Sequence, residues 1–140
     1  ILKNCLGNKT TGARSSNFYL RIVAGEPFGS LMCDTSSATN PAQPIIDNVA
    51  AFTVRYRVRP SAANIEEKRF IDTPTNWSLV DAVEVCLDLI GKSITPTKTV
   101  DGSGDTVDST YVDCQGNTVS RGNHLHVVQR NLFTVYTAQR

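Results

Sequence analysis

Four cysteines constrain the fold of this 140-residue chain more than any other feature of its sequence. They are Cys5, Cys33, Cys86 and Cys114, and the absence of a Cys-x-x-Cys pair argues against zinc-ribbon and thioredoxin-type sites. Sequential pairing closes two loops whose ends lie 28 positions apart in both cases. In the chain-entropy model, a disulfide that closes such a loop stabilises a protein by about 3 to 4 kcal/mol. We therefore predict the bridges Cys5–Cys33 and Cys86–Cys114 in a periplasmic or extracellular protein, with four buried thiols in a cytosolic protein as the alternative.

The length and charge of the chain limit its organisation and its partners. Residues 1–140 suit a single domain with one core. Lys and Arg total 14 against 13 for Asp and Glu, and this net charge of +1 argues against a general affinity for nucleic acid or anionic membrane. No apolar run approaches the roughly 18 residues of a membrane span. Because the sequence begins with Ile1 and shows no signal-peptide pattern, we expect a processed chain or an excised part whose targeting segment is missing.

The apolar pattern predicts a mainly β or α+β domain built from antiparallel strands. The clearest strand spans 51–59, where apolar and polar side chains alternate, so that one face packs and the other meets water or a partner. The segment 79–90 fits a helical stripe as well as strict alternation, and its β-branched content favours a strand. Further strands are expected at 17–23, 31–33, 111–114, 118–119 and 125–138.

Three polar segments separate these strands. Residues 35–44 are rich in Ser, Thr, Asn and Pro and predict a loop. Residues 61–75 could hold one or two helical turns, which Pro74 would end. Residues 92–109 contain almost nothing to bury, and we expect an exposed loop there.

Three blocks of the sequence, taken in order, resemble the C-terminal globular part of PilW-type minor type IV pilins, which are similar to the GspJ-type minor pseudopilins of type II secretion. The first block runs from Asn17 through Cys33 and the Gln43-Pro44 pair to Val58. The second is the Trp-led stretch 77–87, and the third is the Thr-rich stretch 130–137. Together the blocks extend the resemblance over most of the chain.

The resemblance implies a structural protein rather than an enzyme. Members of this family have a hydrophobic N-terminal helix that anchors the precursor in the inner membrane and later packs in the filament core, joined to a β-rich head. Residues 1–140 would be the disulfide-linked head without that helix. With other minor pilins and pilus-tip proteins, such a subunit helps to prime assembly and forms the fibre tip at the cell surface. Alternatives are an extracellular binding module for adhesion or DNA uptake, a type II secretion minor pseudopilin, and a small extracellular enzyme.

A row of arginines marks one departure from the family pattern. After the central strand the family often has an acidic, glycine-containing stretch, whereas this chain carries Arg55, Arg57 and Arg59 on one strand face. The row could bind an acidic partner, DNA phosphates or a neighbouring subunit through bidentate contacts. The alternative is a charged face that prevents aggregation between strand edges.

An acidic loop offers a candidate calcium site. Asp101, Ser103 and Asp105 match the opening of an EF-hand loop, in which oxygen ligands alternate along the chain. The position of the closing acid is occupied by Val112, so Asp108 or Asp113 would have to substitute. Some pseudopilins bind calcium, and the resemblance therefore permits such a site. The alternative is a solvated loop without a metal, and no other cofactor is predicted.

Other catalytic and metal-binding patterns are weak or missing. His124 and His126 lie on one face of a predicted strand and could supply two ligands to zinc or copper, but no third ligand is evident, and we interpret them as surface histidines. The sequence contains no nucleophile elbow, phosphate-binding loop, dinucleotide fingerprint or HExxH motif. We therefore do not expect an enzyme.

Overall fold

The computed structural model describes residues 2–10, 15–35, 40–59, 69–95 and 98–135, and within them the fold is mainly β with antiparallel pairing throughout. No helix in these ranges has the length and apolar character needed to cross a membrane. The elements are β1 (Leu2–Lys3), β2 (Lys9–Thr10), β3 (Asn17–Ile22), β4 (Gly29–Asp34), β5 (Gln43–Val58), β6 (Arg69–Ile71), a 3₁₀-helix η1 (Trp77–Leu79), β7 (Val80–Ile90), β8 (Lys98–Val100), β9 (Thr106–Asp108), β10 (Thr110–Val112), β11 (Thr118–Ser120) and β12 (His126–Thr134).

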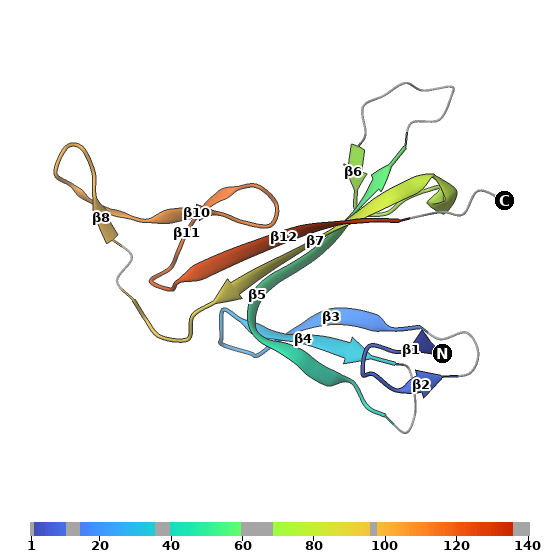
Figure 1. Cartoon of the computed structure of the whole chain (residues 1–140). Coiled ribbons are helices and arrows are strands. Elements are labelled where there is room, and N and C mark those ends of the chain that lie inside the picture. The colour runs from blue at the N-terminus through green and yellow to red at the C-terminus, as the bar shows by residue number, and fades with distance from the viewer. Residues whose placement is uncertain (1, 11–14, 36–39, 60–68, 96–97, 136–140) are drawn as a thin grey trace.

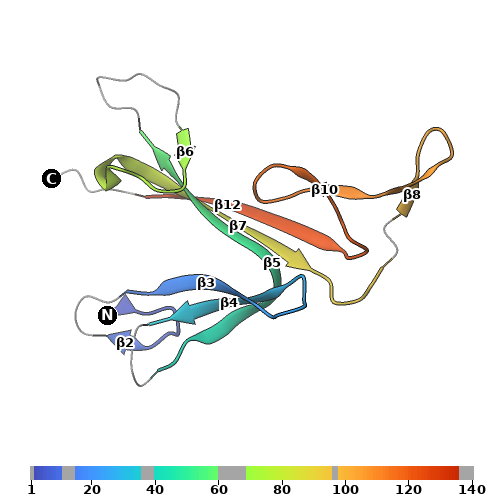
Figure 2. The ribbon, with the colours of Figure 1, turned by 180° about the vertical axis from the view of Figure 1, so that it is seen from behind.

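The long strand β5 belongs to two layers. The main sheet has the order β12-β7-β5-β4-β3, and β6 also pairs with β5. The first part of β5 pairs with β4, and from Val49 onward the strand pairs with β7. Between these parts Asn48 has a φ of 59°, which Asn tolerates better than most residues, and the register shifts between Val49 and Ala51. The strand bends there, so that the β3–β4 layer and the β7–β12 layer lie across from each other (Figures 1 and 2).

Three small hairpins share one turn chemistry. They connect β1 to β2, β8 to β9 and β10 to β11 through residues 4–8, 101–105 and 113–117. In each turn an Asn or Asp side chain accepts the backbone N–H groups of the second and fourth residues after it. The residue three positions after that side chain is always a glycine with positive φ, at Gly7, Gly104 and Gly116.

Two of these hairpins are tied to the main sheet by disulfides. Cys5, in the turn between β1 and β2, bonds to Cys33 on β4. Cys114, in the turn between β10 and β11, bonds to Cys86 on β7. The predicted sequential pairing is confirmed, and the bridges indicate an oxidising location outside the cytoplasm.

The predicted elements are found, with corrections in three segments. Strands 51–59 and 79–90 are confirmed as parts of β5 and β7, but β5 begins at Gln43, inside the segment that was expected to be a loop. The expected loop 92–109 contains the exposed hairpin β8–β9, because its turn supplies backbone hydrogen bonds that need no apolar core. Residues 61–68 of the segment that is expected to hold helical turns lie outside the described residues, and its described part, residues 69–75, contains the strand β6 and no helix.

Candidate functional site

The two faces of β7 differ sharply in burial. Alternate residues of this strand point to opposite sides of the sheet. The covered face, which carries Cys86 and Asp88, is buried at nearly every position of β7, whereas the residues on the other side, the open face, are only half-buried. Buried residues on the covered face are Val80, Ala82, Cys86, Asp88 and Ile90, with Glu84 half-buried among them. Half-buried residues on the open face are Asp81 at one end of the strand and then Val83, Val85, Leu87 and Leu89.

The open face is apolar across two strands. The register places Phe52, Val54 and Tyr56 of β5 beside Leu87, Val85 and Val83 of β7. All of these side chains except that of Val83 line one wall of a groove of about 550 Å³. The groove lies between the two layers, whose backbones are drawn in Figure 1. Among the described residues, no charged side chain lines the groove; its lining consists of Ser16, Asn17, Phe18, Leu31, Phe52, Val54, Tyr56, Val85, Leu87 and Phe133.

Aromatic rings at one end of the open face are exposed. Trp77 meets Tyr56 edge to face, with 4.9 Å between the ring centroids, yet its residue is 58% exposed. Phe133 on β12 lies in register with Val83 and is 56% exposed. Rings of this size bury a large apolar area when a partner covers them.

The covered face holds a buried polar network centred on Asp88, which is 2% exposed. Tyr111 of β10 donates its hydroxyl to Asp88 Oδ2 at 2.7 Å, and His126 Nδ1 of β12 lies 2.9 Å from Asp88 Oδ1. The Tyr111 and His126 rings stack with centroids 4.2 Å apart. Burial, followed by the hydrogen bond to Asp88, raises the pKa of the Tyr111 hydroxyl above its usual range. Tyr111 therefore stays a donor at neutral pH, and the network ties the β10–β11 hairpin to β7 and β12.

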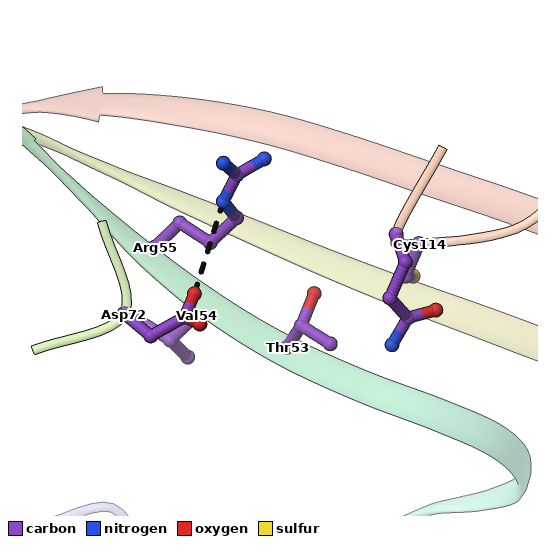
Figure 3. Close-up of a pocket in the computed structure, with 6 residues that line it drawn as sticks. Thr53, Val54, Arg55, Asp72 and Cys114 are labelled. Atoms are coloured by element: carbon purple, nitrogen blue, oxygen red, sulfur yellow. Dashed lines mark ion pairs between the residues drawn. The ribbon is translucent and has the colours of Figure 1, made fainter. Parts of the chain in front are cut away.

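Beside this network lies a polar pocket of about 420 Å³, lined by Thr53, Val54, Arg55, Asp72, Cys114 and Gln115. Figure 3 shows Arg55 and Asp72 at one end, Cys114 at the other and Thr53 between them. Arg55 Nη2 donates to the carbonyl of Phe70 at 3.3 Å, and Arg55 Nε lies 3.8 Å from Asp72 Oδ1. The ion pair compensates the one cation of the pocket.

The predicted arginine row lies on β5 among acidic neighbours. Arg57 Nε donates to Asp81 Oδ1 at 2.7 Å, and both side chains are largely buried. Arg55 faces Asp72, as described above. Arg59 continues the chain after β5, and its backbone N–H donates to the carbonyl of Leu79. The charges of Arg55 and Arg57 are thus compensated within the chain, and partner binding by the row stays a prediction.

The predicted calcium ligands lie along the exposed β8–β9 hairpin. Asp101 Oδ1 accepts the N–H groups of Ser103 and Asp105, both at 2.9 Å, so this carboxylate already serves the turn. Asp108 lies in β9, in register with Lys98. Within the described ranges no three His, Cys, Asp or Glu side chains gather as a metal-binding group. Calcium binding here stays a prediction.

The two histidines have separate structural partners. His124 Nδ1 lies 2.8 Å from the carbonyl oxygen of Gly91, whereas His126 joins the Asp88 network. The interpretation of both as surface histidines is wrong for His126, whose side chain is 8% exposed. The sequence does contain one signal for this network. Asp88 lies two positions after Cys86, so both point toward the hairpin that carries Cys114.

Comparisons of the chain with models of protein families, with curated proteins and with solved structures found no match. The resemblance to PilW-type minor pilins therefore rests on the three sequence blocks alone.

Proposed function

We propose that this chain is the β-rich head of a minor-pilin-type subunit, a structural protein that binds other subunits of a fibre. The observation that carries the proposal is the open face. A folded domain that buries Asp88 and leaves Val85, Leu87 and Phe133 partly exposed keeps an apolar surface available for a partner.

The groove favours a hydrophobic helix of a pilin-type subunit as its occupant. The described part of the lining carries no charged side chain, so burying a charged segment against it would leave the charges of that segment unpaired. A helix satisfies its own backbone hydrogen bonds, whereas an extended segment in the middle of a sheet face would find no backbone partners. The resemblance implies a hydrophobic helix in each subunit, which supports the same assignment.

The experiment is to replace Val85 with Asp in the gene of the source cells and to count surface fibres by electron microscopy. Val85→Asp places a carboxylate in the groove, and we expect fibres to be lost while the protein is still made. Thr118→Asp on the exposed strand β11 is the matched control and should leave fibres unchanged.

Three outcomes separate the alternatives. Loss of fibres with Val85→Asp alone supports the pilin assignment. Normal fibres together with reduced secretion of other proteins would assign the chain to type II secretion instead. Normal fibres and normal secretion would contradict an assembly role for the open face. Circular dichroism of the purified variant shows whether it is folded, which separates lost assembly from misfolding when fibres disappear.

A further inference from the structure

We propose that β12 is a self-pairing edge through which two copies of this chain join in antiparallel orientation. β12 ends the main sheet and pairs with β7 on one side over nine consecutive residues, from His126 opposite Ile90 to Thr134 opposite Ala82. No register shift interrupts this ladder. Within the described part of the chain no strand pairs with its other side.

Most features that natural proteins use to block an edge are missing from β12, although Arg130 places one charge at its centre. Proline, lysine, bulges and very short strands are the common devices. β12 contains neither proline nor lysine and runs without a bulge, and at nine residues it is the longest strand of the main sheet after the interior strands β5 and β7. Val127 and Leu132 are both 52% exposed. The edge is therefore a regular template for another strand.

The sequence of β12 is chemically symmetric about Arg130. The strand that fits this edge is therefore a second copy of β12. An antiparallel pair of identical strands with its two-fold axis at Arg130 sets like side chains opposite each other. The pairs are His126 opposite the partner's Thr134, Val127 opposite the partner's Phe133, Val128 opposite the partner's Leu132 and Gln129 opposite the partner's Asn131. Apolar cross-strand pairs of this kind stabilise sheets by about 0.2 to 1 kcal/mol each.

Arg130 at the centre brings its own counter-charge. Its Nη1 lies 3.2 Å from Glu84 Oε1, and its Nη2 donates to the carbonyl of Asp113. Two copies would place two Arg–Glu pairs side by side around the axis, so each guanidinium has a carboxylate nearby. The like-charge contact is thereby offset, and the axis at Arg130 is retained.

The pairing extends the sheet and keeps both open faces on one side. A two-fold axis perpendicular to the sheet preserves its faces, so Phe133 and the partner's Val127 would be neighbours on a continuous open face. One strand pair is smaller than a standard interface of about 1,600 Å². We therefore expect a weak dimer, with a Kd of about 10 µM to about 1 mM.

Cysteine cross-linking tests the register. Gln129→Cys mixed with Asn131→Cys places two new thiols opposite each other, away from the Cys86–Cys114 bridge, and should give a covalent dimer under mild oxidation. Val127→Cys alone should not cross-link, and neither should Phe133→Cys alone, but their mixture should, because the register pairs these two positions. Thr118→Cys on β11 measures cross-linking by random collision. The readout is a non-reducing gel of the full chain.

Sedimentation of the unmodified chain gives a second readout that needs no cysteine. We expect the fraction of dimer to rise between about 10 µM and about 1 mM, and Leu132→Lys to remain monomeric over the same range. The proposal is overturned if the unmodified chain stays monomeric throughout. It is also overturned if Val127→Cys alone cross-links as fast as the mixture, because the register would then differ.

Discussion

The covered and open faces of β7 come from one strand of eleven residues, yet they are buried by different means. A hairpin of three-residue strands covers the middle of one face and is held there by Cys86–Cys114 and by the Asp88 network. The other face meets the β3–β4 layer only across a groove. The face that the chain covers is thus the one that carries Asp88, whereas the more apolar face is left accessible. Hydrophobicity alone therefore does not decide which face of this sheet is covered.

Removing the Cys86–Cys114 bridge should reduce the difference in burial between the two faces more than any other change. Replacing Cys86 and Cys114 with Ser frees the β10–β11 hairpin, and we expect a loss of about 3 to 4 kcal/mol in the free energy of unfolding. The measurement is urea unfolding without reductant. Replacing Cys5 and Cys33 with Ser is the matched control, because both bridges span 28 positions and have the same loop entropy. A smaller loss for Cys86–Cys114 than for the control would contradict its role in covering Asp88.

Truncating one side chain on each face of β7 measures how tightly the covered and open faces are packed. Ile90 is 5% exposed on the covered face, and Ile90→Ala should cost about 3 kcal/mol through lost burial and a cavity. Leu87 is half-buried in the open groove, and Leu87→Ala should cost about 1 kcal/mol because water already reaches the site. Thermal unfolding of both variants gives the ranking. Equal losses would show that the open face is as well packed as the covered one.

The smallest effect concerns Tyr111 and depends on pH. Tyr111→Phe removes one hydrogen bond to Asp88 and should cost about 1 kcal/mol at neutral pH. Because the pKa of Tyr111 is raised in the folded chain, its proton is held more tightly there than in the unfolded chain. Its contribution is therefore complete below about pH 10 and declines as the pH rises further. Comparing the unfolding temperatures of the chain and Tyr111→Phe across this range should show the gap between them narrowing above about pH 10. A constant gap would exclude this linkage.

The sequence predicts the strands better than it predicts which face of each strand is covered by the rest of the chain. The alternation in 51–59 and the β-branched content of 79–90 identify β5 and β7, and the equal cysteine spacings identify both bridges. A period of two residues shows only that two faces differ. Which face is covered depends on where the chain returns after residue 90, and that return is set by Cys114 and Tyr111 across more than twenty positions.

The β8–β9 hairpin and the bend in β5 depend on local backbone conformation, which the sequence pattern does not predict. Asp101 and Gly104 carry the same turn signal as Asp113 and Gly116, but the strands that flank the first pair have no buried face to reveal them. Asn48 has a positive φ at the point where β5 changes its partner strand, but an asparagine in the sequence does not by itself reveal such a change. The candidate calcium ligands and the arginine row were read from spacing alone, and the structure gives Asp101, Arg55 and Arg57 partners within the chain.

The bend in β5 also has a mechanical meaning. This strand runs through both layers and joins them at a bend, which lies at Asn48 and at the register shift beside it. Residues of both layers line the groove, so an occupant of the kind proposed above would contact both of them. Because β5 runs through both layers, this one strand would connect the two walls around that occupant.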